Sequence, residues 1–201
     1  MTNRKLIKEG DIQTVIRKAI DGGVDTVILR EKDLSFDELY PIAYKLRQVI
    51  DNKNKTEGSN KKIIINSNID VAKEINADGF HTNFENFINK NIEFNGLIGV
   101  SVHSLEEAVL AEKNGASYLL ASHIYKTDCK KGLKPRGLDF IKSIRENTFI
   151  PLIGLGGIND ENLEDVILKG ADGIAVMSYI MADENPFKSA QKLKNNLIKV
   201  R

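Results

Sequence analysis

The sequence predicts a parallel α/β fold, and two observations favour it. Apolar runs of strand length alternate with segments of helical periodicity along the whole chain. In addition, one junction recurs, in which a helical segment ends, often at glycine, and a short step leads into a new apolar run. It is found at Gly23–Val27, Asn76–Phe80, Gly115–Tyr118 and Gly170–Ile174. Glycine suits the position after a helix because it tolerates positive φ.

Seven strands are predicted after residue 25. Their cores are almost continuously apolar, as in parallel strands that are buried on both faces. They are Thr26–Arg30, Lys62–Asn66, Gly79–His81, Leu97–Val100, Tyr118–Ala121, Ile150–Gly154 and Gly173–Met177. An eighth strand would have to precede Asp11, where Met1–Ile7 is short and polar, so we expect it to be short or truncated. The count predicts a compact (β/α)₈ TIM barrel that forms a single domain over residues 1–201.

Helices are predicted between these strands from apolar spacing close to 3.6 residues. They are Asp11–Ile20, Ser35–Asp51, Ile69–Ile75, Ser104–Asn114, Leu138–Glu146, Asp160–Lys169 and Asn185–Val200, with Phe84–Asn89 as one more short helix. Two of them start with the S-x-x-E pattern of a capping box, Ser35 with Glu38 and Ser104 with Glu107. The lysine-rich stretch Asn52–Lys62 is predicted to be a solvated loop.

Composition excludes several classes of function. The net charge is +1, so no global field favours a nucleic acid or a membrane surface as partner. Cys129 is the only cysteine, so no internal disulfide can form. The first residues have no apolar signal-peptide segment, and no run reaches the ~20 apolar residues of a membrane span. A soluble, cytoplasmic protein is the expectation.

Candidate site residues follow the strands at their carboxyl ends, where parallel barrels bind ligands. They are Arg30, Lys32, Asn66, His81, Ser101, His103, His123, Gly156, Gly157, Met177 and Ser178. Arg30 and Lys32 can hold a carboxylate or phosphate, although an Arg30–Glu31 pair beside a solvated Lys32 explains the same residues. The glycines after Ile153 can expose backbone amides to a phosphate, with the Ser178 hydroxyl nearby, or form a simple tight turn.

The stretch Ser122–Gly137 combines the most chemistry. His123 follows a buried strand and can exchange a proton near pH 7, although a structural histidine is the alternative. Thr127, Lys130 and Lys131 favour a polar pocket around it, whereas the two lysines alone would fit a solvated lid. Nothing but the nearby lysines would activate Cys129. Metal-ligand spacing is absent from the three histidines.

Several segments together resemble the thiamine phosphate synthase superfamily. They are VILREK from residue 27, IIINSNID from residue 63, GVSVHSLEEA from residue 99, PLIGLGGI from residue 151 and GADGIAVMS from residue 170. The resemblance extends from Asn3 to about Ile180 and implies a (β/α)₈ barrel. Synthases in this superfamily join a pyrimidine pyrophosphate to a thiazole phosphate with Mg²⁺. Their two metal-binding aspartates correspond to Ser67 and Asn86 of this chain.

The run HIYKTDCKKGLKPRG resembles the TenI branch of thiazole tautomerases, which lack those aspartates. This resemblance implies a metal-independent isomerase without cofactor that aromatises a thiazole carboxylate phosphate in thiamine biosynthesis. It assigns acid–base chemistry to His123, and phosphate contacts to Gly157, Met177, Ser178, Thr127 and Lys130. It also places Arg30, Lys32 and Asn66 in the wall of the ligand pocket, with Ser101 and His103 at its mouth.

We therefore expect a thiazole tautomerase acting on a small thiazole phosphate, with neither nucleic acid nor membrane as partner. Two alternatives remain open. One is a Mg²⁺-dependent thiamine phosphate synthase with altered metal ligands, and the other is a barrel that binds thiazole or thiamine phosphates without catalysis. The sequence leaves the oligomeric state open between a monomer and a homodimer.

Overall fold

The computed structural model describes residues 1–130 and 132–200. The chain forms two compact units. We call the first unit the part made of Met1–His81, Phe94–Gly96 and Met177–Lys194. The second unit comprises Thr82–Glu93, Leu97–Val176 and the residues from Asn195 onward. Each unit has its own layer of parallel strands covered by helices.

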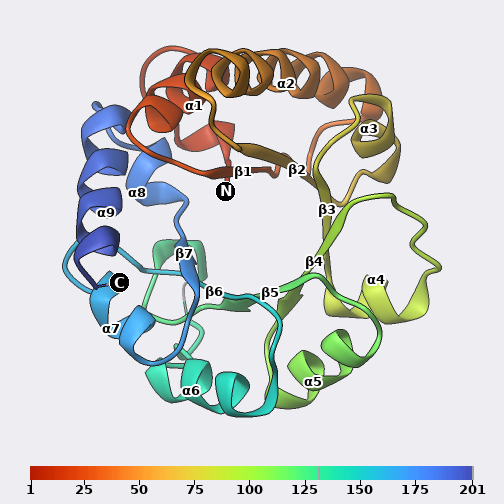
Figure 1. Ribbon diagram of the computed structural model, residues 1–201, viewed down its shortest axis with the longest axis vertical. Helices are drawn as coiled ribbons and strands as arrows, with labels where there is room; N and C mark the ends of the chain where they lie inside the picture. Colours follow the sequence, from red (N-terminus) through yellow and green to blue (C-terminus); the bar gives the residue numbers. More distant parts are fainter. Residues whose placement is uncertain (131, 201) are drawn as a thin grey trace. The chain divides into compact units, whose positions relative to one another are not determined.

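The first unit contains β1 (Thr26–Leu29), β2 (Lys62–Asn66) and the start of β3 (Gly79–Asn83), which pair in parallel in that order (Figure 1). Leu29 is in register with Ile65, and Asn66 with His81. Buried side chains of the strands and of α2 form the core; fully buried examples are Leu29, Leu46, Ile50, Ile63 and Ile65. The helices of this unit are α1 (Ile12–Asp21), α2 (Phe36–Glu57), α3 (Ile69–Glu74) and α8 (Ser178–Met181).

The second unit contains β4 (Leu97–Val102), β5 (Tyr118–Ser122), β6 (Leu152–Leu155) and β7 (Gly173–Ala175), again parallel and adjacent in chain order. Its helices are α4 (Phe84–Asn89), α5 (Leu105–Lys113), η2 (Asp128–Lys130), α6 (Leu138–Asn147) and α7 (Leu163–Leu168). In Figure 1, α5 and α6 run along the outer side of these strands, and they contact β4, β5 and β6. Helix α9 (Pro186–Val200) begins in the first unit and ends in the second.

The seven strands expected after residue 25 are confirmed within the described residues, with ends that shift by up to two residues. The expected eighth strand before Asp11 is wrong. That segment forms the 3₁₀ helix η1 (Arg4–Leu6), and before it the amide of Thr2 donates to the Ile28 carbonyl of β1 at 2.9 Å. The reason is a contact between residues distant in sequence: the amide of Arg4, two residues after Thr2, donates to the Glu31 carboxylate instead of to a strand partner. The α/β class with parallel strands is confirmed, and the described residues form seven parallel strands instead of the eight that the barrel prediction required.

The predicted capping boxes are present, with one variation. Ser35 and Glu38 bond each other's backbone amides at the start of α2. At the start of α5 the Glu107 amide donates to Ser104 Oγ at 3.1 Å. The Glu107 carboxylate accepts from the amide of His103, at 2.6 Å, so this box also fixes a candidate site residue.

The predicted loop Asn52–Lys62 is wrong over its first half, because α2 continues to Glu57 and ends at Gly58 with φ +62°. The ammonium of Lys53 pairs with Asp21 at 2.5 Å and with Glu57 at 2.7 Å. The side-chain amide of Asn54 donates from Nδ2 to the Lys61 carbonyl at 2.9 Å. The polar composition of this stretch therefore reflects the exposed last turns of a helix.

Within residues 1–130 and 132–200, every helix is too short or too polar to pass through a lipid bilayer.

Gly99 allows the close pairing of β4 with β5. A Cβ built on Gly99 would collide with the ring of Tyr118, its register partner. We predict that Gly99→Ala lowers the free energy of unfolding by about 1–3 kcal/mol, the usual cost of overpacking. In urea unfolding, the Ala substitution should cost much less in a Tyr118→Leu background. Equal costs in both backgrounds would show that the contact does not matter.

Candidate active site

Three polar residues at neighbouring strand ends form a row in the first unit. Arg30 follows Leu29 as Asn66 follows Ile65, and Asn66 is in register with His81. Residues in register on parallel neighbours point to the same face of a sheet. The structure therefore brings Arg30 and Asn66 together as predicted, and it adds His81, which the sequence placed at a strand end without a role.

His81 is fully buried. Burial, together with the positive charge of Arg30, lowers the pKa of its imidazole from 6.5 to about 3. The ring is therefore neutral at physiological pH, and it is suited to hydrogen bonding rather than to holding an anion by charge.

Ser67 follows Asn66 at the position where the family resemblance predicts a metal-binding aspartate, and it carries a hydroxyl instead of a carboxylate. Ser67 has φ +67°, its amide donates to the His81 carbonyl at 2.9 Å, and its hydroxyl accepts from Asn66 Nδ2 at 2.6 Å. The end of β2 thus presents an amide and a hydroxyl. Lys32 is exposed in the turn after β1.

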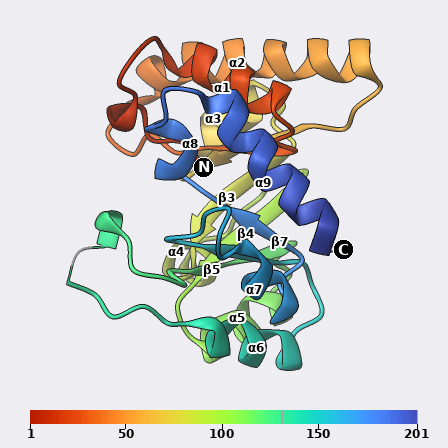
Figure 2. The same ribbon diagram turned by 90° about the vertical axis from the view of Figure 1, so that its left-hand side faces the viewer.

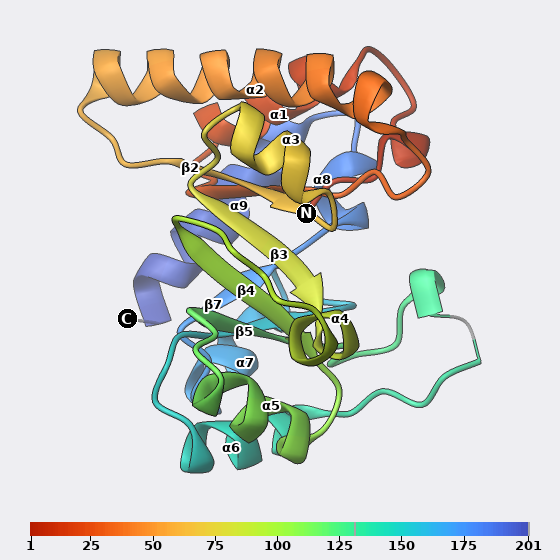
Figure 3. The same ribbon diagram turned by 90° about the vertical axis from the view of Figure 1, so that its right-hand side faces the viewer.

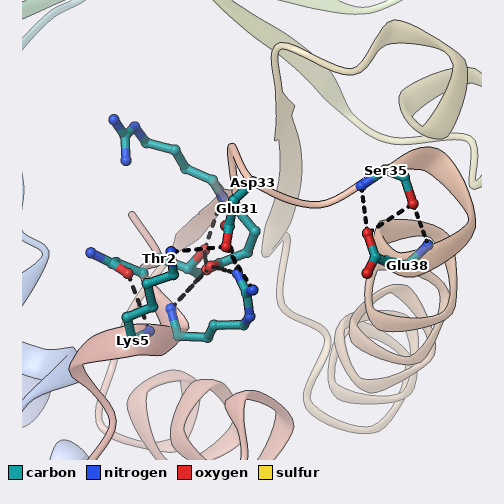
Figure 4. A network of polar contacts seen from close by, with 9 residues as sticks. Thr2, Lys5, Glu31, Asp33, Ser35 and Glu38 are labelled. Carbon is teal, nitrogen blue, oxygen red and sulfur yellow. Dashed lines mark hydrogen bonds and ion pairs between the residues drawn. The ribbon is translucent and has the colours of Figure 1, made fainter.

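A network around Glu31 ties the chain's first residues to the end of β1 (Figure 4). The Glu31 carboxylate accepts from the Thr2 hydroxyl at 2.7 Å and from the amide of Arg4 at 3.0 and 3.1 Å. It also pairs with the Arg4 guanidinium at 3.1 Å. The cation that neutralises Glu31 is therefore Arg4 and not Arg30. Sequence reasoning missed Thr2 and Arg4, because no local pattern joins residues that are 27 and more positions apart from Glu31.

His123 follows β5 in the second unit and is 6% exposed. Its Nε2 atom is buried and has no hydrogen-bond partner within the described part of the chain. Its carbonyl oxygen accepts from the amide of Arg136 at 3.0 Å. Gly156 fits against it so closely that a Cβ there would collide with the Cβ of His123. The backbone of His123 is therefore held on two sides, while one polar ring atom is left unsatisfied.

Two side chains hold the Ser122 carbonyl next to His123. The Nδ1 atom of His103 lies 2.9 Å from it, and Nε of Arg136 donates to it at 3.2 Å. Because a carbonyl oxygen only accepts, Nδ1 of His103 must carry the proton, so Nε2 of the neutral ring is an acceptor. Ser101 lies half-buried on β4, two residues before His103. Arg136 is a contributor that sequence reasoning did not single out.

The segment between β5 and α6 forms a loop closed at its base. The amides of Arg136 and Gly137 donate to the carbonyls of His123 and Ile124, at 3.0 and 3.1 Å. Figures 2 and 3 both show the described part of this loop extending away from the strands of the second unit. Thr127 is half-buried, whereas Lys130 and Cys129 are exposed. Lys131 lies outside the described residues.

Gly156 and Gly157 follow β6 with φ +104° and +68°. A Cβ on Gly157 would lie 2.5 Å from the Lys126 carbonyl, so both glycines are required by the close approach of residues 123–126. Asn162 Nδ2 donates to the Gly157 carbonyl at 3.0 Å. The amides of Gly157 and Ile158 make no hydrogen bond within the described part of the chain, so they are available to an acceptor.

Met177 and Ser178 belong to the first unit. The Met177 carbonyl accepts from the amide of Met181 at 2.9 Å, and exposed Ser178 is the first residue of α8. Helix α8 contacts η1, so Ser178 and the segment held by Glu31 belong to one packed region of the first unit.

The family model for thiamine monophosphate synthase matches residues 1–180. A thiamine-phosphate synthase of Clostridium acetobutylicum is 43% identical over 97% of this chain and 88% of its own length. One of Pyrococcus furiosus is 35% identical over 96% of this chain and 91% of its own length. The chain belongs to the thiamine monophosphate synthase family. A solved thiamine phosphate pyrophosphorylase of Pyrococcus furiosus superposes with a TM-score of 0.86 at 34% identity, covering 99% of this chain and 94% of that one.

The expected assignment to the tautomerase branch is wrong. The relatives that match almost the whole chain are named thiamine-phosphate synthases, which are transferases and not isomerases. That assignment depended on one loop, residues 122–137, and on the absence of aspartates at Ser67 and Asn86. A local resemblance in a loop that is exposed over most of its length carries less weight than identity spread across 97% of the chain.

The described residues do not fit a carboxylate site for Mg²⁺. Ser67 and Asn86 occupy the positions expected to hold aspartates, and Asn86 is in the first turn of α4, where its amide donates to Asn83 Oδ1 at 3.0 Å. No group of three or more His, Cys, Asp or Glu side chains within residues 1–130 and 132–200 is placed to hold a metal.

The buried His81 predicts an acid-sensitive fold. Between pH 6.5 and about 3 the unfolded imidazole binds a proton that the folded one does not, so the free energy of unfolding falls as pH falls. The slope from this residue is at most about 1.4 kcal/mol per pH unit. We predict that urea unfolding from pH 7 to pH 4 shows a smaller pH slope for His81→Gln than for the unmodified protein. Parallel curves would contradict the depressed pKa.

Proposed function

We propose that this chain is a thiamine-phosphate synthase, a transferase that joins a pyrimidine pyrophosphate to a thiazole phosphate. In this reaction the bond from the pyrimidine's methylene carbon to pyrophosphate breaks, and a bond from that carbon to the thiazole nitrogen forms. The observation that carries the proposal is the 43% identity to a thiamine-phosphate synthase over 97% of the chain.

The cationic end of β1 suits the leaving group. Negative charge grows on the departing pyrophosphate, so a fixed cation stabilises the transition state more than the bound substrate. We assign this role to the guanidinium of Arg30, which forms no hydrogen bond or ion pair within the described residues, with Lys32 beside it. Asn66 and neutral His81 add uncharged hydrogen-bonding groups in the same row.

A phosphate group needs donors, and each unit by itself offers a group of them. In the second unit, the amides of Gly157 and Ile158 are unbonded and follow a strand's carboxyl end. Thr127 and Lys130 on the neighbouring loop can add a hydroxyl and an ammonium. In the first unit we assign phosphate contacts to Met177 and Ser178, at the start of α8.

His123 is proposed as a hydrogen-bonding residue for substrate. A buried polar atom without a partner lowers stability by about 1–3 kcal/mol. The unsatisfied Nε2 of His123 therefore favours a ligand that supplies the missing partner. Ser101 and His103 are proposed as further polar contacts, with Nε2 of His103 acting as an acceptor.

One observation favours a second function. The replacement of both expected aspartates, by Ser67 and Asn86, fits a protein that binds thiazole or thiamine phosphates without turnover. Two broader expectations are retained as proposals: residues 1–201 fold as one domain, and the protein acts in the cytoplasm.

The synthase proposal predicts that the protein, supplied with pyrimidine pyrophosphate, thiazole phosphate and Mg²⁺, forms thiamine phosphate and pyrophosphate. Arg30→Met should lower kcat/KM by about 10²–10³-fold, as loss of one charge-stabilising donor does. Arg17→Met, on the exposed side of α1, serves as the matched control and should stay near the unmodified rate. Tight binding of both substrates without product would favour the non-catalytic function.

The missing carboxylates make a separate prediction. Aspartate tolerates positive φ, so Ser67→Asp should fold and place a carboxylate at the end of β2. In Ser67→Asp, calorimetric titration should show Mg²⁺ binding at least about tenfold tighter, or about 1.4 kcal/mol. The uncharged variant Ser67→Asn is the control. Unchanged Mg²⁺ affinity would mean that a carboxylate at this position does not hold the metal.

A further inference from the structure

We propose that Thr2 and Glu31 are positioning residues that hold Arg30 in place for the pyrophosphate group. The inference rests on the proposed function for the identity of the anion. It draws on the hydrogen bonds in Figure 4, all of which lie within the first unit.

Thr2 links directly to the backbone of Arg30. Its side chain is fully buried, and its Oγ1 accepts from the Arg30 amide at 2.9 Å while donating to Glu31 Oε1 at 2.7 Å. Only a hydroxyl among small side chains can accept and donate at once in this way. The Thr2 amide also donates to the Ile28 carbonyl at 2.9 Å, so residues 28, 30 and 31 are all tied to one residue.

Glu31 holds the other side of the link. Its side chain is 1% exposed, and it receives the Arg4 amide on both oxygens and the Arg4 guanidinium on one. Burying a carboxylate is expensive, and a well-packed apolar residue would often stabilise a fold more. A purely structural anchor therefore does not require this charge.

The charge has a second consequence for Arg30. A carboxylate adjacent in sequence would compete with any ligand for the Arg30 guanidinium. Because Arg4 neutralises Glu31, Arg30 keeps a guanidinium that is unpaired within the described residues and available to an anion. Arg4 in turn forms a bidentate pair with exposed Asp33, both bonds at 2.8 Å, which holds its guanidinium in one plane.

The same segment reaches a second candidate phosphate contact. Helix η1 begins at Arg4 and contacts α8, whose first residue is Ser178. Movement of residues 2–6 would therefore disturb both Arg30 and the start of α8. We therefore expect changes in this segment to weaken the binding of ligands that carry phosphate groups more than they lower the free energy of unfolding.

The test compares Thr2→Val, Glu31→Gln, Thr2→Ser and, as a control, Glu9→Gln. Thr2→Val keeps the shape but removes both hydroxyl bonds, whereas Thr2→Ser retains them. We expect Thr2→Val and Glu31→Gln to raise the calorimetric Kd for inorganic pyrophosphate, and the KM for pyrimidine pyrophosphate, by about tenfold. Thr2→Ser should restore values within about twofold, and Glu9→Gln, the same change at an exposed carboxylate outside the Glu31 network, should stay within that range.

Urea unfolding of the same variants separates positioning from stability. The proposal is overturned if Thr2→Val lowers the free energy of unfolding while the Kd for pyrophosphate stays unchanged, or if the unmodified protein does not bind pyrophosphate. Failure of the proposed function has a different signature. In that case the unmodified protein binds pyrophosphate without forming thiamine phosphate, and the Kd values of the variants still decide the role of Thr2 and Glu31.

Discussion

The hydrogen bonds and the ion pair of the buried Glu31 carboxylate are the interactions on which the carboxyl end of β1 depends. A carboxylate that is removed from water must be surrounded by donors, and here the donors come from Thr2 and Arg4. Meeting that requirement draws residues 2–6 across the end of β1 and makes a 3₁₀ helix of a segment that could otherwise extend a strand. The same requirement separates Arg30 from the nearest negative charge. One buried charge thus determines the local backbone and the availability of a cation.

The second unit is organised by close backbone contact rather than by charge. Residues 123–126 approach Gly156 and Gly157 so closely that no side chain fits between them, and bonds to Leu155 and Gly156 hold Ile124 and Tyr125. His103 and Arg136 fix the preceding carbonyl. The backbone of this segment is thus fixed by contacts within the protein, whereas the buried Nε2 of His123 has no hydrogen-bond partner among the described residues.

What could be predicted from sequence was local, and what could not be predicted depends on distant partners. The strands and the Ser35 cap follow from patterns within a few residues, and they were predicted to within two residues. The last turns of α2 required Lys53 to reach Asp21, 32 positions earlier in the sequence. The fold of residues 2–6 required Glu31. The positions of the candidate site residues at strand ends were predictable because β-strand ends are, but their partners Thr2, Arg4 and Arg136 carry no local signal.

Family membership and metal chemistry are separate inferences for this chain. Membership follows from similarity spread over nearly every element, whereas a metal site depends on a few carboxylates, and two of these are replaced by Ser67 and Asn86. In the proposed reaction, the multiple negative charges of a pyrophosphate must still be balanced. Among the described side chains at the end of β1, the charge available to an anion is positive, because Arg4 neutralises Glu31 and the Arg30 guanidinium has no ion-pair partner. In the proposed reaction, Arg30 therefore bears more of the stabilisation of the pyrophosphate than it would beside a carboxylate-bound metal, so the residues that orient Arg30 matter more.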